Sequence, residues 1–115
     1  MKKLKLYIET SVWNFLISSD VPYEQKITKE LFNEIKSGEF EIYISELVYA
    51  EIEKAPQDIK NKLKKLIEKY EPTVLESTKE VEELTEKYMS EKIVPEKYKD
   101  DLLHIAFAVV YNLDM

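Results

Sequence analysis

The fold is decided by residues 4–16, which read LKLYIETSVWNFL. Apolar and polar residues alternate over residues 4–8, which is typical of a β-strand with one buried face. A short helix follows at once, and either Thr10 or Ser11 can cap it. The apolar residues of this helix are Val12, Trp13, Phe15 and Leu16. A strand that leads directly into a helix is the usual opening of an α/β fold.

The same order of elements repeats along the chain. Residues 40–44 (FEIYI) alternate again and predict a second strand, and residues 73–76 predict a short third strand. Helical spacing of apolar residues predicts helices over about 22–37, 46–55, 58–70 and 98–112, and one that begins at Ser77 and contains Tyr88.

Several residues mark the predicted ends of these helices. Gly38 stands just past the helix over 22–37, as a C-terminal glycine should. Ser45 can cap the helix over 46–55, and Ser77 forms a capping box with Glu80. In the helix over 22–37, the residues expected on the buried face are Ile27, Leu31, Phe32 and Ile35.

Strands that alternate with helices predict a three-layer α/β/α sandwich around a mainly parallel sheet. The length of 115 residues corresponds to a single domain over residues 1–115. The helix over 98–112 is apolar almost all round apart from His104, so we expect it to be buried centrally. Such a helix normally leads into another strand, and the chain stops soon after it. We therefore expect the last strand to be missing or provided by another chain, with an uncovered sheet edge open to pairing.

Composition excludes several classes of protein. One glycine excludes a Gly-rich phosphate loop, and the absence of cysteine excludes thiol catalysis, disulfides and cysteine metal sites. The single histidine argues against a zinc enzyme. No apolar run has the length of a signal peptide core or a membrane span, which predicts a cytoplasmic protein that does not enter the membrane.

The charge balance is acidic, with 17 Lys against 23 acidic residues and a net charge of −6. This balance argues against a general nucleic-acid coat, because lysine and arginine drive phosphate binding. It remains compatible with a nuclease whose carboxylates hold metal ions.

Two glutamates differ from the many that lie on exposed helix faces. Glu51 follows Val48 by three residues and Leu47 by four, so it lies on the apolar face of its helix. We expect a partner for it, or a position at the edge of the face where its head reaches water. Glu9 ends the first strand and can share a rim with Glu51, because ligands bind beyond the carboxyl ends of parallel strands. Taken alone, Glu9 is more typical of an exposed strand-end residue that faces a helix N-terminus.

Asp100 and Asp101 open the most apolar helix of the chain. Capping accounts for one of them. His104 follows Asp100 by four residues and can hydrogen-bond to it, and it is more typical of a satisfied core or rim histidine than of a catalytic one. Acids that converge near one rim repel each other unless a cation joins them, and oxygen ligands favour Mg²⁺ or Mn²⁺.

The segments over residues 7–12, 45–52 and 100–106 resemble, in order and spacing, the three acidic motifs of the PIN domain family. The likeness covers nearly the whole chain, from residue 4 to the end. The resemblance implies a PIN-like fold and a metal-dependent endoribonuclease that hydrolyses RNA phosphodiester bonds. Such domains occur in toxins of toxin–antitoxin pairs and in RNA-processing enzymes, so an antitoxin protein is an expected partner.

The resemblance also implies roles for individual residues. Glu9, Glu51 and Asp101 match the three acids that bind the metal and carry catalysis. Asp100 is a neighbouring metal-ligand candidate, and Thr10 or Ser11 matches the hydroxyl that supports the first acid. The chain has Glu9 where the family usually has Asp, and family members continue into a further strand and a further acidic or polar residue. We therefore expect a domain that is truncated at its C-terminus.

The sequence is compatible with two functions. The first is a Mg²⁺- or Mn²⁺-dependent ribonuclease built on Glu9, Glu51 and Asp101. The second is a catalytically inactive PIN-like binding module that acts through a homodimer or an antitoxin-type surface. We expect a homodimer under either interpretation, because the sheet has an open edge.

Overall fold

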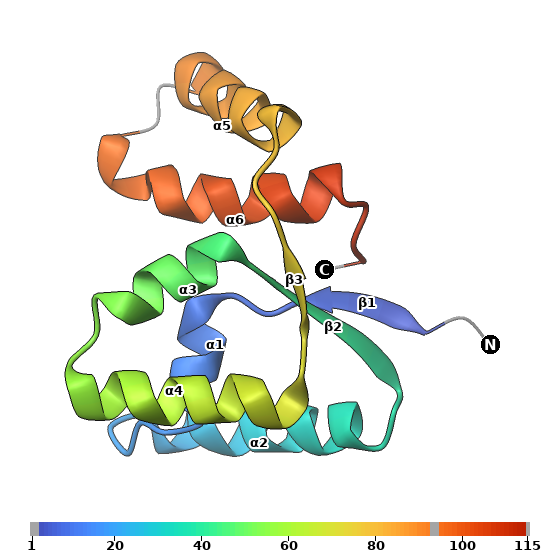
Figure 1. The fold of residues 1–115 in the computed structure, drawn as a ribbon, viewed down its shortest axis with the longest axis vertical. Helices are drawn as coiled ribbons and strands as arrows, with labels where there is room; N and C mark the ends of the chain where they lie inside the picture. Colours follow the sequence, from blue (N-terminus) through green and yellow to red (C-terminus); the bar gives the residue numbers. More distant parts are fainter. Residues whose placement is uncertain (1–2, 93–94, 115) are drawn as a thin grey trace.

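The computed structural model describes residues 3–92 and 95–114, and within them three short strands form one parallel sheet (Figure 1). The strands are β1 (Leu4–Tyr7), β2 (Phe40–Ser45) and β3 (Thr73–Leu75), in the order β1-β2-β3. Leu6 is paired with Ile42, and Ile44 with Val74. The predicted parallel sheet is confirmed, and each strand lies within one or two residues of its predicted position.

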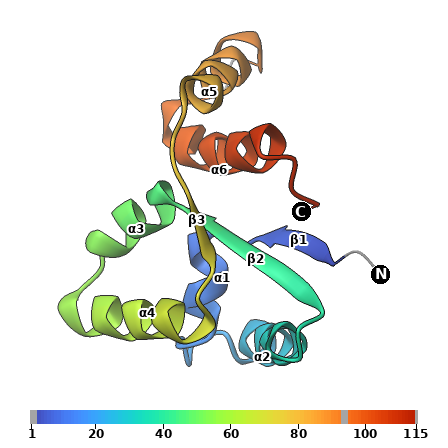
Figure 2. The same cartoon turned by 45° about the vertical axis from the view of Figure 1, so that its right-hand side comes forward.

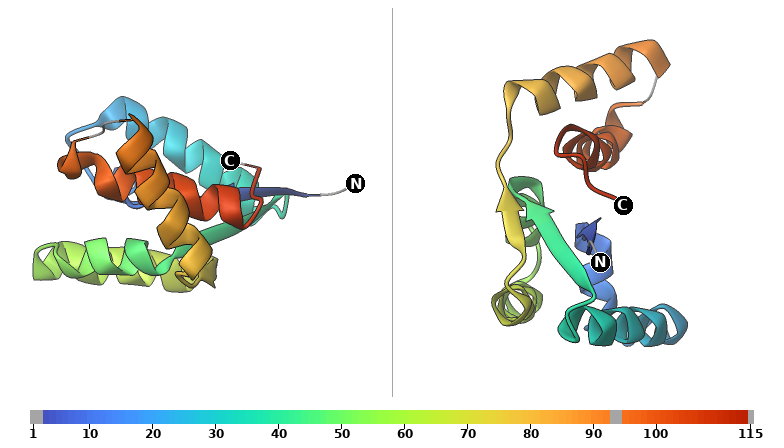
Figure 3. Two further views of the ribbon diagram at one scale, coloured as in Figure 1. Left: turned by 90° about the horizontal axis from the view of Figure 1, so that it is seen from above. Right: turned by 90° about the vertical axis from the view of Figure 1, so that its right-hand side faces the viewer.

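Helices fill the connections between the strands, which makes this an α/β fold. After β1 come α1 (Thr10–Phe15) and α2 (Pro22–Lys36), and after β2 come α3 (Glu46–Glu53) and α4 (Gln57–Tyr70). The chain leaves β3 through α5 (Lys79–Lys92), a short 3₁₀ turn over Glu96–Tyr98, and α6 (Lys99–Val110). In the side view of Figure 3, α1, α2 and α4 lie on one side of the sheet, and α5 and α6 lie on the other.

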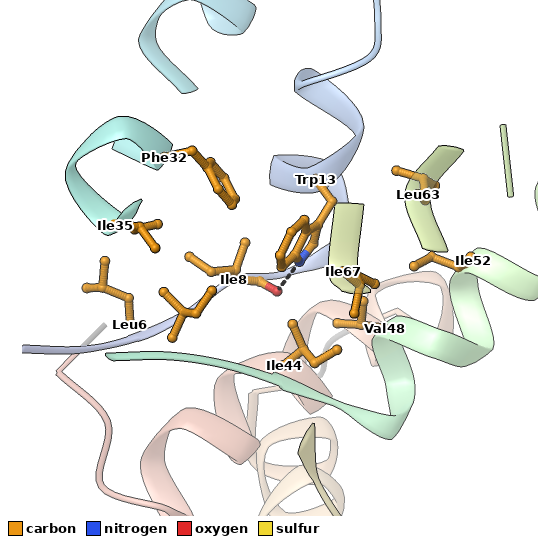
Figure 4. Close-up of a cluster of buried hydrophobic side chains, with 11 residues drawn as sticks. Leu6, Ile8, Trp13, Phe32, Ile35, Ile44, Val48, Ile52, Leu63 and Ile67 are labelled. Carbon is orange, nitrogen blue, oxygen red and sulfur yellow. Dashed lines mark hydrogen bonds between the residues drawn. The ribbon is translucent and has the colours of Figure 1, made fainter. Parts of the chain in front are cut away.

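The larger hydrophobic cluster lies between the sheet and α1 to α4 (Figure 4). Trp13 is fully buried at its centre and donates its indole N–H to the backbone oxygen of Ile8 at 3.1 Å. Its ring lies 5.1 Å from that of Phe32, centroid to centroid, and Phe32 lies 4.8 Å from Tyr70. Aromatic packing therefore ties the short helix α1 to α2 and α4.

The smaller cluster lies under α5 and α6, and its buried members are Leu75, Val81, Ala106 and Phe107. The expectation that α6 is buried on all sides is wrong. Ile105 and Val109 are 51% and 54% exposed, because α6 packs through its other face on α5 and the sheet. Figures 1 and 2 show the pair α5 and α6 standing above the sheet.

Two predicted caps are also wrong. Glu9, and not Thr10 or Ser11, caps α1 by accepting from the backbone N–H of Val12 at 3.2 Å. Thr78, and not Ser77, accepts from the N–H of Val81 at the start of α5, also at 3.2 Å.

Ser45 is confirmed at the cap position of α3, but its side chain makes no capping bond. Its hydroxyl instead bonds Tyr7.

The predicted buried face of α2 is confirmed at Phe32 and Ile35, which are buried, and Leu31 is partly buried against the same cluster. It is wrong at Ile27, which is 47% exposed, and Thr28 is buried in its place. Thr28, Phe32 and Ile35 share one face at the i, i+4, i+7 spacing, and Ile27 lies beside that face.

The residues after α6 return to the edge of β1 that faces away from β2 (Figure 3). The N–H of Asp114 donates to the backbone oxygen of Lys5 at 2.9 Å, and the N–H of Lys5 donates to Oδ2 of Asp114 at 2.7 Å.

Among the described residues, no helix has both the length and the apolar character needed to cross a membrane.

Candidate functional site

A cavity of about 590 Å³ brings together the three acids expected to carry function. Glu9 follows β1, Glu51 lies in α3 beyond the end of β2, and Asp101 lies in the first turn of α6. The shared rim of Glu9 and Glu51 is therefore confirmed. The remaining polar lining is Thr10, Ser11 and Asn14 of α1, and the apolar lining is Ile52, Ala55, Pro56, Ile59 and Leu63 of α3, α4 and the turn between them.

Glu51 is half-buried, and two side chains hold its carboxylate. Its Oε1 accepts from the hydroxyl of Thr10 and lies 2.8 Å from Nε2 of His104. The expectation that Glu51 needs a partner is confirmed. The identity of the main partner, a histidine 53 residues away in the chain, was not expected.

His104 is buried, and both of its ring nitrogens have partners. Its Nδ1 lies 2.7 Å from the Tyr7 hydroxyl, which in turn lies 2.6 Å from Oγ of Ser45. The expected bond between His104 and Asp100 is wrong, since Tyr7 and Glu51 occupy the two nitrogens. The interpretation of His104 as a satisfied core histidine is confirmed.

Burial raises the pKa of the Tyr7 phenol well above its usual value. The hydrogen bond from Ser45 works in the opposite direction, and the nearby charges of Glu51 and Glu9 raise the pKa further. Tyr7 therefore stays protonated and keeps a proton to donate.

Glu9 has a structural task as well as a place in the cavity wall. Its Oε1 accepts from the backbone N–H of Val12 and from the hydroxyl of Ser11. A carboxylate at this position also interacts favourably with the free N–H groups of the first helical turn. Both interpretations of Glu9 made from the sequence are thus compatible with where it lies.

The two aspartates of α6 are placed differently. Asp101 is exposed and lines the cavity, whereas Asp100 is half-buried and lies outside its lining. Neither caps the helix, because the cap position is Tyr98.

The donor set fits a hard cation in chemical type, since carboxylate oxygens surround one cavity. It is not preassembled: within residues 3–92 and 95–114, no three acidic or histidine side chains are close enough to hold one ion. Oε1 of Glu9 is held at the start of α1, and Oε1 of Glu51 is held by Thr10 and His104.

Sequence reasoning missed Tyr7, Ser45 and His104 as parts of this site. One signal existed, because His104 is the single histidine of the chain and interrupts the most apolar helix. A buried polar ring in such a helix requires partners, yet sequence spacing points only to neighbours on the same helix. Tyr7 and Ser45 gave no comparable signal.

Another cavity, of about 650 Å³, lies between α5 and α6 and contains none of the predicted site residues. Its charged lining mixes Lys79 and Lys99 with Glu82, Glu83 and Glu86. Lys99 lies 3.6 Å from Glu86 and Lys79 lies 3.8 Å from Glu83, so each lysine of this lining has an acidic partner.

Comparisons of the chain with models of protein families, with curated proteins and with solved structures gave no match.

Proposed function

We propose that this chain is a metal-dependent endoribonuclease of the PIN-like kind, with helices on both faces of its sheet forming a three-layer sandwich. One observation carries the proposal: Glu9, Glu51 and Asp101, from three distant segments of the chain, line one cavity. Carboxylates gathered in this way repel one another, and a hard divalent cation such as Mg²⁺ or Mn²⁺ relieves that repulsion.

Glu9, Glu51 and Asp101 would hold the cation, with Asp100 as a neighbour behind Asp101. When bound, such an ion acidifies water and neutralises charge that develops on a phosphodiester. Thr10 and His104 hydrogen-bond the Glu51 carboxylate and would orient it, and Ser11 would do the same for Glu9. Asp101 is exposed and would be accessible to an RNA strand.

The acidic character of the protein constrains how RNA would bind. The net charge is −6, and the acids of the cavity face an anionic substrate. RNA affinity should therefore depend on the divalent ion, and lysines beyond the rim must contribute the rest. An antitoxin protein as a partner and a cytoplasmic location belong to this proposal through the resemblance to toxin-type PIN domains.

A second function is favoured by a different observation. No ready-made ligand set exists among the described residues, and Glu9 is used as a helix cap. A PIN-like binding module without catalytic activity, acting as a homodimer or through an antitoxin-type surface, is consistent with both facts.

RNA cleavage assays separate the two functions. We expect cleavage of a fluorescent RNA with Mg²⁺ or Mn²⁺ and none with EDTA. Glu51→Gln and Asp101→Asn should each lower the rate by about 100-fold or more, because each removes charge from the cation site. Glu46→Gln is the matched control, since Glu46 is exposed on the same helix as Glu51 and lies outside the cavity lining.

Equal rates in EDTA, or a fully active Glu51→Gln variant, would contradict the nuclease proposal. A protein that cuts no RNA in any metal but sediments as a stable dimer would support the binding module. A monomer that cuts RNA and ignores partner peptides would exclude the binding module.

A further inference from the structure

A network of hydrogen bonds joins four side chains from different parts of the fold to the Glu51 carboxylate. It runs from Ser45 at the end of β2 through Tyr7 of β1 to His104 of α6, and then to Glu51 of α3, which Thr10 of α1 also contacts. The distances are 2.6 Å from Ser45 to Tyr7, 2.7 Å from Tyr7 to His104 and 2.8 Å from His104 to Glu51.

With Glu51 ionised and His104 neutral, the donors and acceptors of this hydrogen-bond network can be arranged in one direction only. An ionised Glu51 can only accept, so Nε2 of His104 must carry a proton. In a neutral imidazole the other nitrogen, Nδ1, must then accept, and the Tyr7 hydroxyl is its donor. Tyr7 in turn accepts from the Ser45 hydroxyl. The raised pKa of the Tyr7 phenol agrees with its role as a donor in this chain.

The two oxygens of Glu51 differ in their surroundings. Thr10 and His104 both contact Oε1, and no group in the described part of the chain hydrogen-bonds Oε2. In that same part, no buried side-chain nitrogen or oxygen lacks a partner. Oε2 is therefore accessible, and because Glu51 lines the cavity, this is the oxygen that remains free for a ligand.

We infer that His104 is a positioning residue: the Ser45–Tyr7 pair fixes its Nε2–H tautomer, and His104 thereby holds Oε1 of Glu51 and leaves Oε2 free. This inference rests on the proposed function, because the purpose of the free oxygen is to bind the divalent cation. A glutamate side chain has three rotatable bonds, and the two contacts on Oε1 restrict them before the ion arrives. Groups of this kind, one step removed from a metal, change metal affinity by about 10- to 100-fold.

A purely structural histidine would also be buried and hydrogen-bonded, so the test needs readouts that a structural role does not affect. The first is the tautomer of His104. As the single histidine of the chain, it gives unambiguous signals in a long-range ¹H–¹⁵N correlation spectrum of protein labelled at histidine.

We expect the Nε2–H form in the wild type and a loss of that preference in Tyr7→Phe. Tyr43→Phe is the matched control, because Tyr43 is paired with Tyr7 across the sheet but bonds Glu41 through its hydroxyl. A wild type in the Nδ1–H form, or a Tyr7→Phe variant with an unchanged tautomer, would overturn the inference.

The second readout is Mn²⁺ affinity, measured by electron paramagnetic resonance without RNA. Tyr7→Phe should weaken Mn²⁺ binding by about tenfold, and Tyr43→Phe should leave it unchanged. His104→Gln keeps an N–H that can reach Glu51, so it should bind Mn²⁺ more tightly than His104→Leu. Circular dichroism and thermal unfolding confirm that each variant is folded.

Equal Mn²⁺ affinity in wild type, Tyr7→Phe and His104→Leu would overturn the inference while leaving the proposed function intact. A wild type that neither binds Mn²⁺ nor cleaves RNA would instead remove the proposed function. The tautomer measurement would then decide by itself whether Tyr7 and His104 fix the Glu51 carboxylate.

Discussion

At the scale of single residues, Trp13 connects α1 to the end of β1 and to the helices α2 and α4. It is fully buried in α1, a helix of 6 residues that is too short to be stable alone. Its indole bonds the backbone of Ile8, and its ring packs against Phe32 and Tyr70. Since Glu9, Thr10 and Ser11 adjoin or form the first turn of α1, the packing of Trp13 also positions one wall of the cavity.

Trp13→Ala should lower the free energy of unfolding by about 3–5 kcal/mol, the usual cost of removing a large buried aromatic side chain. Urea unfolding followed by circular dichroism would measure this. Tyr23→Ala is the control, because Tyr23 is 70% exposed and its loss should change stability by at most about 0.5 kcal/mol. Equal effects of the two substitutions would contradict the packing described for Trp13.

Tyr7 gives a prediction for alkaline pH. Its folded-state pKa lies above the unfolded value, chiefly because of burial, so the unfolded chain releases this proton first as the pH rises. Its contribution to stability is complete below about pH 10 and falls at higher pH, by at most about 1.4 kcal/mol per pH unit.

Tyr7→Phe should therefore lose stability less steeply than the wild type between about pH 9.5 and 11. Urea midpoints over this range provide the measurement. The comparison uses the slope with pH, so a constant destabilisation of the variant does not affect it. Parallel slopes for the two proteins would show that Tyr7 ionises alike in both states.

At the scale of elements, helix ends were predicted well where one residue type dominates the local energetics. Gly38 follows α2 with a φ of +88°, a region that disfavours residues with a Cβ atom. Ends that depend on hydroxyl groups were predicted less well, because a serine or threonine can bond other groups than the helix. Ser45 and Thr10 do this, bonding Tyr7 and Glu51.

Gly38→Ala should destabilise the protein by about 1 kcal/mol. A Cβ atom at this position meets nothing within 4 Å, so the cost arises from the backbone conformation and not from a clash. Thermal unfolding would report it as a lower Tm. Lys36→Ala is the control, because Lys36 is exposed at the end of the same helix and its loss should change the Tm little. A Gly38→Ala variant with an unchanged Tm would show that α2 ends differently in solution.

At the scale of the whole molecule, the two faces of the sheet carry cores of unequal size. Among the described residues, 11 buried side chains form the cluster with α1 to α4, and 4 form the cluster under α5 and α6. Ile105 and Val109 of α6 remain exposed on the outer side of the smaller unit. The pair α5 and α6 is thus the less strongly held part of the fold.

Native-state hydrogen exchange should show this difference. Amides of β1, β2 and α3 should exchange only through global unfolding. Amides of α5 and α6 should exchange through a partial opening, and the free energy of that opening should be lower than the free energy of global unfolding. Adding denaturant should make the opening free energies of the two groups of amides converge, because only global unfolding responds strongly to denaturant. Uniform protection across both faces from the outset would show that the clusters form one cooperative unit.

The sequence by itself determined the kinds of elements, their order and the parallel sheet, because these follow from apolar spacing and from the short-range effects of glycine and proline. It also placed Glu9 and Glu51 at one rim, since both follow the carboxyl ends of parallel strands, whereas Asp101 was assigned to this site through the resemblance. Only the tertiary structure decided the partners of Glu51 and the exposure of α6. The bonds of His104 to Tyr7 and Glu51 join residues 97 and 53 positions apart. A hydrogen bond requires its donor and acceptor to be placed to within a few tenths of an ångström. The spacing of residues along one helix or strand does not specify positions that finely.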